Sequence, residues 1–246
     1  MSNNSDMIKS LETKLTFFGL DKAVEYIEQH SRDISSNAIE TMNTILSDDY
    51  VNKYNNSYNN MLSKSGLKCK RGILSEISTG NGRRYNDNAL EQIKDLSFIE
   101  SKKNVCVFGE SGAGKSYLVA SIAEELSKRL IRNKYTDYIS LMDTLTELRK
   151  ESKAKYEKKI EFFAKIPVLI LDDFLADEVT PDEVTVMFTL IKRREIYEKP
   201  TIVATQYDPE EWVELMTGVK KKIKGEADSI RRRLVDSAYL ITIEKL

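Results

Sequence analysis

The sequence is poor in the residues that build metal centres and covalent cross-links. Its 246 residues include two cysteines, Cys69 and Cys106, and one histidine, His30. These are too few for a four-ligand zinc site or a disulfide framework, and a serine hydrolase triad would depend on His30 alone. The sequence also lacks any run of about 18 apolar residues, and it does not start with the apolar stretch of a secretory signal. We therefore expect no membrane segment and a location in the cytosol.

The charged residues are nearly balanced in number but unevenly placed. The chain has 38 basic and 39 acidic side chains, and its 41% hydrophobic content is enough for the core of one or two domains. Residues 1–64 contain no proline and repeat apolar residues at steps of three and four, which predicts a small helical module. Residues 65–86 combine four glycines and five basic side chains with a single acidic one. We interpret this segment as a flexible basic connector.

Residues 87–246 alternate short β-rich apolar runs with longer helical patterns. The expected strands cover residues 104–109, 135–141, 167–173, 200–205 and 239–243. The expected helices cover residues 115–130, 141–164, 181–197, 208–216 and 226–236. Repeated alternation of this kind predicts an α/β fold whose central parallel sheet has about five strands and is covered on both faces.

A phosphate-binding loop is the strongest motif in the sequence. Residues 109–116 read GESGAGKS, which matches the pattern GxxxxGK[ST] between an apolar strand and a helix. Glycines let successive N–H groups approach a phosphate, the helix adds the positive end of its dipole, and Lys115 adds a full charge for catalysis. A glycine-rich turn with an accidental lysine is the alternative. The residues expected to bind ATP are Gly109, Glu110, Ser111, Gly112, Ala113, Gly114, Lys115, Ser116 and Tyr117.

Two consecutive aspartates end another buried strand. Asp172 and Asp173 follow the apolar run 168–171. We expect Ser116 and Asp172 to bind Mg²⁺, and we expect Asp173 to orient the attacking water and accept its proton. Aspartate is one methylene shorter than the glutamate that many such ATPases have at the second position. An acidic residue that only caps the following turn is therefore the alternative for Asp173.

Further motifs resemble those of one ATPase family. The sequence LDDF at 171–174 is followed by ATQ at 204–206, by Trp212 and by SIRRRL at 229–234. Together with the phosphate loop, this series resembles the AAA+ ATPases of the IstB/DnaC group, and above all the IstB-like helpers of insertion-sequence transposases. The resemblance implies an AAA+ P-loop core without a C-terminal lid, a small helical domain before it, and a location in the bacterial cytoplasm or nucleoid.

The resemblance also implies roles for residues outside the loop. Gln206, with Thr205, corresponds to the sensor of the γ-phosphate, and a polar residue that bonds its own loop is the alternative. The arginine triplet corresponds to the region of the arginine finger, with Arg233 as the first choice and Arg231 as the second. A solvated or salt-bridged helix face is the alternative. A finger that acts on a neighbouring subunit implies a ring or spiral oligomer in which ATP hydrolysis requires subunit contact.

Basic clusters are candidates for contacts to the phosphates of double-stranded DNA. The resemblance points to the helical region between the second and third strands, where interleaved acidic residues also fit an ordinary solvated helix. The connector is a further candidate, with a plain linker as its alternative. The residues concerned are Lys153, Lys155, Lys158 and Lys159 in the helical region, and Lys68, Lys70 and Arg71 in the connector.

These observations favour an ATP-dependent regulator that oligomerises on duplex DNA and delivers it to an IstA-like transposase. The runner-up is a loader of the replicative helicase, because its core would have the same motifs. The third hypothesis is a stand-alone P-loop kinase or other stand-alone P-loop NTPase. A kinase of this type would need a substrate lid, and the sequence shows no sign of one.

Overall fold

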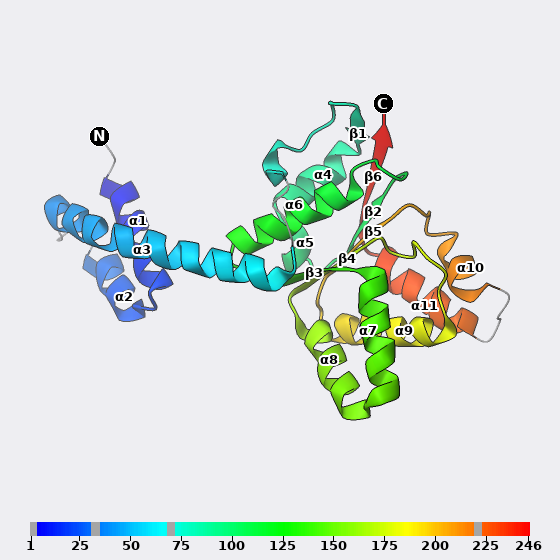
Figure 1. Ribbon diagram of the computed structural model, residues 1–246. Coiled ribbons are helices and arrows are strands. Elements are labelled where there is room, and N and C mark those ends of the chain that lie inside the picture. Colours follow the sequence, from blue (N-terminus) through cyan, green and yellow to red (C-terminus); the bar gives the residue numbers. More distant parts are fainter. Residues whose placement is uncertain (1–3, 31–34, 68–71, 219–222) are drawn as a thin grey trace. The chain divides into compact units, whose positions relative to one another are not determined.

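The computed structural model describes residues 4–30, 35–67, 72–218 and 223–246 (Figure 1). The chain divides into two compact units, residues 1–60 and 61–246. Within the described ranges, no helix is long and apolar enough to pass through a bilayer.

The first unit consists of helices, as the apolar periodicity predicts. α1 (Asn4–Phe17) and α2 (Asp21–His30) are separated by Gly19, whose φ of +73° favours glycine. α3 (Ser36–Ser65) begins in the first unit and ends in the second. A small cluster of buried apolar side chains holds the unit together, and it contains Leu11, Leu15, Ile27 and Ile39.

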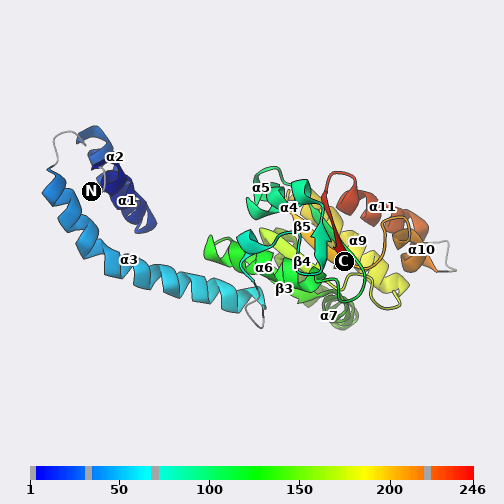
Figure 2. The same ribbon diagram turned by 90° about the horizontal axis from the view of Figure 1, so that it is seen from above.

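A six-stranded sheet forms the centre of the second unit (Figures 1 and 2). Its strand order is β1-β6-β2-β5-β4-β3, and the neighbours are parallel except for the antiparallel pair β1 and β6. The strands are β1 (Arg83–Tyr85), β2 (Val105–Phe108), β3 (Asn133–Asp137), β4 (Val168–Asp172), β5 (Thr201–Thr205) and β6 (Tyr239–Lys245). β2, β4 and β5 are buried along their whole length, as parallel strands covered on both faces should be. The predicted α/β fold is confirmed.

Helices cover both faces of the sheet because successive side chains of a strand point to opposite sides. Val105 and Val107 of β2 pack into the core on one face, whereas Cys106 and Phe108 pack into the core on the other. The first face is covered by α4 (Asp87–Lys94), α5 (Ser97–Glu100) and α6 (Lys115–Lys128). The second face is covered by α7 (Tyr138–Glu151), α8 (Lys153–Lys165), α9 (Pro181–Ile196), α10 (Trp212–Thr217) and α11 (Lys224–Val235).

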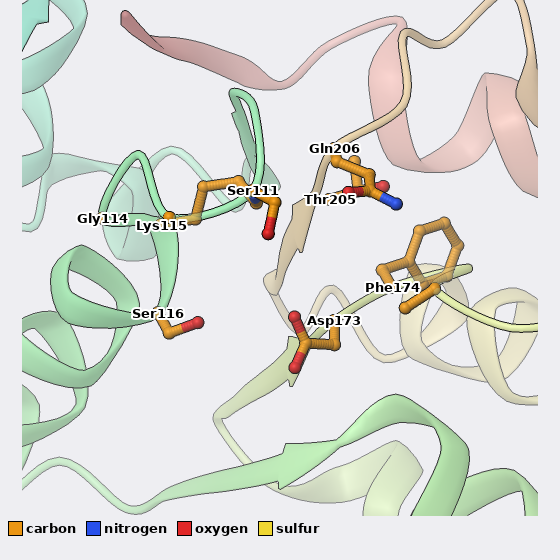
Figure 3. A pocket seen from close by; sticks show the side chains of 10 residues that line it. Ser111, Gly114, Lys115, Ser116, Asp173, Phe174, Thr205 and Gln206 are labelled. Atoms are coloured by element: carbon orange, nitrogen blue, oxygen red, sulfur yellow. The ribbon is translucent and has the colours of Figure 1, made fainter. Parts of the chain in front are cut away.

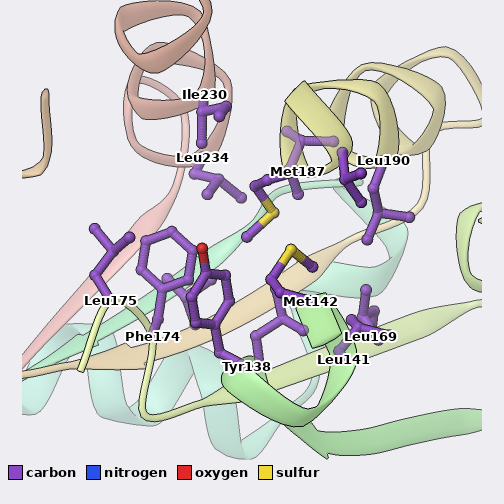
Figure 4. Packing of buried hydrophobic residues seen from close by; sticks show 14 of the residues in the cluster. Tyr138, Leu141, Met142, Leu169, Phe174, Leu175, Met187, Leu190, Ile230 and Leu234 are labelled. Carbon is purple, nitrogen blue, oxygen red and sulfur yellow. The ribbon is translucent and has the colours of Figure 1, made fainter. Parts of the chain in front are cut away.

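Aromatic packing anchors the turn that follows β4. Phe174 is buried, and its ring centroid lies 5.0 Å from that of Tyr138 and 4.9 Å from that of Trp212. Figure 4 shows Phe174 beside Tyr138 in the core between the sheet and its helices. The indole N–H of Trp212 donates to the carbonyl of Tyr207 at 3.0 Å. Trp212 therefore packs α10 against the core and also holds the start of the β4 turn through Phe174.

The region after β3 differs from the prediction of a strand over 135–141 and one helix over 141–164. β3 ends at Asp137 because this residue caps α7, its carboxylate accepting a hydrogen bond from the N–H of Ser140 at 2.8 Å. The helical region also breaks at Ser152, whose extended backbone separates α7 from α8. Tyr138 and Leu141, which the prediction placed in the strand, instead lie on the buried side of α7.

The segment 65–86 contains regular structure where we expected a flexible connector. η1 (Leu74–Glu76) and β1 lie in this segment, and Leu74, Ile77 and Tyr85 are buried. β1 pairs with β6, which adds one strand to the predicted sheet. Local sequence did not reveal this strand because its partner lies far along the chain. The predicted DNA contacts Lys68, Lys70 and Arg71 lie outside the described residues.

Candidate functional site

The predicted phosphate loop connects β2 to α6. Lys115 is buried, with 8% of its surface exposed, and its Nζ donates to the carbonyls of Gly109 and Glu110 at 2.8 and 3.0 Å. Burial lowers the pKa of Lys115, whereas the carboxylates of Asp173 and Asp172 raise it. The ammonium group is thus held at the loop and faces two acidic side chains from another strand.

Asp172 lies at the end of β4 and contacts the start of α6. Its Oδ1 accepts a hydrogen bond from the hydroxyl of Ser116 at 3.1 Å, and its Oδ2 accepts one from the phenol of Tyr135. Oδ1 also accepts the N–H of Asp173 at 3.1 Å. These three donors come from α6, β3 and the turn after β4. They fix the orientation of the carboxylate.

Asp173 occupies a strained turn directly after β4. Its φ is +52°, a left-handed conformation that costs roughly 1 kcal/mol for a residue with a Cβ. The turn is held by the buried Phe174, whose N–H donates to a main-chain carbonyl of β5 at 2.8 Å. Partial burial and the carboxylates of Asp172 and Asp137 raise the pKa of Asp173. Backbone strain and a raised pKa together are typical of functional sites.

Loop residues such as Lys115 and Ser116, together with Asp173, line a cavity of about 520 Å³ between the loop and the ends of β4 and β5 (Figure 3). Figure 3 shows Ser111, Lys115 and Ser116 on the side of the loop, and Asp173 and Gln206 on the opposite side. The cavity lies at the carboxyl ends of parallel strands, where open α/β sheets bind their ligands. The structure therefore brings together predicted residues from three separate parts of the sequence.

The oxygen atoms at this site suit Mg²⁺. This ion prefers oxygen ligands and commonly binds through one or two carboxylates together with phosphate oxygens of a nucleotide. The Ser116 hydroxyl and the Asp172 carboxylate are in direct contact and supply two such oxygens. Among the described residues, no group of three or more His, Cys, Asp or Glu residues could hold a metal ion. Ser116 and Asp172 therefore suit a Mg²⁺ ion whose other ligands include phosphate oxygens of a nucleotide.

The sequence is similar to known ATP-binding proteins of insertion sequences and to a helicase loader. A family profile described as "IstB-like ATP binding protein" matches residues 10–245. The chain belongs to this family. A protein of Geobacillus stearothermophilus, named as an ATP-binding protein of insertion sequence IS5376, is 28% identical over 194 residues, or 78% of this chain and 73% of the relative. The replicative helicase loader DnaI of Bacillus subtilis is 28% identical over 147 residues, or 56% of this chain and 44% of DnaI.

The fold of this IstB-like protein also occurs in solved structures. The crystal structure of DnaI superposes with a TM-score of 0.58 at 25% sequence identity, and the match covers 72% of this chain and 92% of that chain. The similarity confirms the predicted P-loop NTPase fold. Together, the family match and the fold show an AAA+ protein that binds ATP.

Tyr117, the last of the predicted ATP-binding residues in the IstB-like chain, faces a second cavity of about 260 Å³. This cavity is also lined by Tyr85, Arg83 and residues of the segment 73–81. Gly72 approaches the Tyr117 ring so closely that a Cβ at this position would lie 1.8 Å from the phenol oxygen. Because Tyr117 directly follows the Ser116 of the first cavity, the two cavities are neighbours along α6.

Arg233 lies outside the cavity of its own chain. Its Nε donates to the carboxylate of Glu195 on α9 at 2.7 Å. The neighbouring Arg231 and Arg232 pair with Asp228 at 3.6 and 3.1 Å. The IstB-like chain therefore does not bring its predicted finger to its own phosphate loop.

The described basic residues predicted to contact DNA all lie on α8. Lys155 pairs with Glu151 at 2.5 Å. Glu157 and Glu161 pair instead with Arg193 of α9, at 2.8 and 3.3 Å. The cluster lysines that form no ion pair with any residue described in the structure are Lys153, Lys158 and Lys159. Among these four lysines, Lys155 is the one whose ion pair the described residues show.

Sequence reasoning missed three residues that contact the site of this IstB-like protein. Tyr135 reaches Asp172 because β3 and β4 are neighbours. Arg83 of β1 and Lys245 of β6 donate to carbonyls of the phosphate loop at 2.7 and 2.6 Å. No local motif marks these residues, since each reaches the site through strand pairing between distant segments.

Proposed function

We propose that this IstB-like protein hydrolyses ATP in the cavity between the phosphate loop and Asp173. The observation that carries the proposal is the position of Asp173 across the cavity from Ser116, on a strained turn that Phe174 anchors (Figure 3). An ionised carboxylate in this position can orient a water molecule and accept its proton as the water attacks the γ-phosphate. A raised pKa makes Asp173 a stronger base than an ordinary aspartate.

The remaining residues of the cavity suit the other parts of the nucleotide. The N–H groups of the loop and Lys115 would bind the β- and γ-phosphates, and Gln206 would contact the γ-phosphate from β5. Ser116 and Asp172 would hold Mg²⁺, which supplies neutralising charge at the phosphates when bound. The second cavity, lined by Tyr117, offers an aromatic surface for the adenine base.

Self-association would complete the site. Arg233 lies outside the cavity of its own chain and pairs with Glu195 on the protein surface. In a ring or spiral, α11 of one subunit would bring Arg233 to the γ-phosphate bound by the next. A guanidinium there stabilises the charge that develops during hydrolysis. Hydrolysis would therefore depend on assembly.

Double-stranded DNA is the proposed substrate of that assembly. Lys158 and Lys159 of α8 form no ion pair with the described residues, so their positive charge is not neutralised by the acidic residues of this helix. Contacts of this kind are made to phosphates and do not read base sequence. We therefore propose that duplex DNA binds along α8.

Delivery of this DNA to a transposase is the function we favour. The relative named for insertion sequence IS5376 matches 78% of this chain, and the helicase loader DnaI matches 56%. Family membership argues against a stand-alone kinase. Loading of a replicative helicase is the second candidate, supported by the similarity of the fold to DnaI at a TM-score of 0.58.

Substitution of Asp173 tests the catalytic part of the proposal. Asp173→Asn should retain ATP binding and lower DNA-stimulated turnover about 10²- to 10⁴-fold, because it removes the base. Lys115→Ala should abolish ATP binding. The matched control is Asp177→Asn, an exposed aspartate further along the same turn that does not line the cavity. Unchanged turnover in Asp173→Asn would exclude this residue from the mechanism.

Electron microscopy and co-sedimentation test the assembly and the partner. The wild-type protein should form rings or spirals on duplex DNA when ATP and Mg²⁺ are present. Such complexes should then bind a transposase and not a replicative helicase. A protein that stays monomeric and unbound at low salt would contradict the assembly, and selective binding of the helicase would favour the second candidate.

A further inference from the structure

Two basic residues of the strand pair β1 and β6 bind the phosphate loop. Arg83 and Lys245 are directly opposed in the antiparallel register. Nε of Arg83 donates to the carbonyl of Ala113 at 2.7 Å. Nζ of Lys245 donates to the carbonyl of Ser111 at 2.6 Å. One cross-strand pair therefore holds two carbonyls that are two residues apart in the loop.

Glycines allow the loop to lie against these strands. A Cβ at Gly109 would lie 2.5 Å from the carbonyl oxygen of Ile243 on β6. A Cβ at Gly114 would lie 2.9 Å from Nε of Arg83 on β1. Both distances are too short for a side chain. The strand pair is thus the surface on which the loop rests.

The charges of this pair are unusual for a sheet. Like charges directly opposed on antiparallel strands repel each other, and neither Arg83 nor Lys245 forms an ion pair with a carboxylate in the described part of the chain. The next pair in register, Arg84 and Glu244, has opposite charges and forms an ion pair. Burial lowers the pKa of Lys115, the carboxylates of Asp173 and Asp172 raise it, and the nearby Lys245 lowers it. Three cations are therefore concentrated at the loop, and a bound polyanion would relieve their repulsion.

Peptide geometry connects these contacts to the cavity. Within a trans peptide unit the C=O and N–H bonds point to opposite sides, and the described chain has no cis peptide. The carbonyls of Ser111 and Ala113 point toward the two cations. The N–H groups of Gly112 and Gly114 therefore point away from the strands, and both glycines line the cavity of about 520 Å³. A hydrogen bond to a carbonyl also polarises the N–H group of the same peptide.

We propose that Arg83 and Lys245 form a cationic clamp that holds the phosphate loop in its anion-binding conformation and strengthens the binding of the β- and γ-phosphates. This inference rests on the proposed binding of ATP at the loop. Both are positioning residues, because they contact loop carbonyls and not the reacting atoms. Their charges add to that of Lys115, so the effect of the clamp grows with the number of phosphates on the ligand.

Calorimetric titration of the full chain with ATP, ADP and AMP tests the clamp. Arg83→Gln and Lys245→Gln should each weaken ATP binding about threefold to tenfold, because each removes a charged donor from the loop. The loss should be smaller for ADP and smallest for AMP, and Arg83→Lys should restore part of it. The matched control is Arg84→Gln, which removes the same charge from the other face of the same strand and should leave ATP binding unchanged.

The outcomes separate the clamp from the proposed function. If the wild type binds ATP and both glutamine variants bind it equally well, the clamp is refuted and the proposed function stands. An equal loss for ATP and AMP would also refute the clamp, since it indicates a damaged fold or base site. A wild type that binds no ATP would refute both. If thermal unfolding shows that Arg83→Gln does not fold, the test depends on Lys245→Gln, because Lys245 is exposed.

Discussion

The hydroxyl of Ser116 lies 3.1 Å from Oδ1 of Asp172, although 56 positions separate the two residues in the sequence. The contact joins the start of α6 to the end of β4. The other carboxylate oxygen of Asp172 accepts the phenol of Tyr135 from β3. Three segments thus set the position of the oxygens that we expect to hold Mg²⁺.

Substitution of Tyr135 should change the requirement for Mg²⁺. Tyr135→Phe removes the donor to Oδ2 of Asp172, and loss of such an outer partner commonly weakens metal binding about tenfold or more. We expect the Mg²⁺ concentration for half-maximal ATP hydrolysis to rise accordingly, while nucleotide binding without Mg²⁺ stays the same. Tyr239→Phe is the control, because its hydroxyl lies 3.4 Å from that of Ser101, outside the cavity. An unchanged Mg²⁺ requirement would show that Tyr135 does not orient Asp172.

The pH dependence of hydrolysis should report the environment of Asp173. Its pKa is raised by partial burial and by the carboxylates of Asp172 and Asp137. The base must be ionised, so kcat should fall as the pH drops through a value above the ordinary one of about 4. Asp137→Asn removes one negative charge but retains a good helix cap, and the acid limb should therefore move to lower pH. Asp143→Asn, elsewhere on α7, is the control, and an acid limb that stays in place would contradict the assignment.

Mixed oligomers should show whether Arg233 acts on a neighbouring subunit. Arg233→Ala should bind ATP normally but hydrolyse it slowly, because its own cavity is intact and the finger for the next subunit is missing. Asp173→Asn should have an intact finger and an inactive cavity. Mixing the two variants should restore hydrolysis above the level of either one, measured as phosphate release with duplex DNA. If the rate of the mixture is only the average of the rates of the two variants, each ATP site works without its neighbour.

The lysines of α8 should determine the salt dependence of DNA binding. Each phosphate contact contributes about 0.9 to the slope of log affinity against log salt concentration. If each of the two lysines makes one phosphate contact, the double substitution of Lys158 and Lys159 by glutamine should reduce the magnitude of that slope by about 1.8. The reduction should be the same for duplexes of different sequence. Lys165→Gln is the control, because Lys165 on the same helix is paired with Glu161 at 2.9 Å. A slope equal to that of the wild type would exclude α8 as the DNA-binding surface.

The parts of the fold that local sequence determines were predicted well. The phosphate loop depends on eight consecutive residues whose chemistry is readable without the rest of the chain. The helix predicted over 181–197 is α9 at Pro181–Ile196, because Thr180 and Glu183 form a capping box and Pro181 starts the first turn. These determinants lie next to each other in the sequence, so no knowledge of the tertiary fold was needed.

The parts that depend on strand order could not be predicted. β1 is three residues long, and it forms a strand because β6 lies beside it. Tyr135 and Asp172 meet because β3 and β4 are adjacent, which no pattern near either residue indicates. The strand predicted up to residue 141 was too long because the capping hydrogen bond of Asp137 outweighs the β propensity of the residues after it.

The support of the phosphate loop by β6 has a consequence for synthesis on the ribosome. The hydrogen bond between Lys245 and Ser111 joins residues that are 134 positions apart. A nascent chain can thus have its complete GxxxxGKS motif outside the ribosome before the strand that supports it has been synthesised. The contacts of β6 with the loop can then form only after the residues of the other five strands have been synthesised.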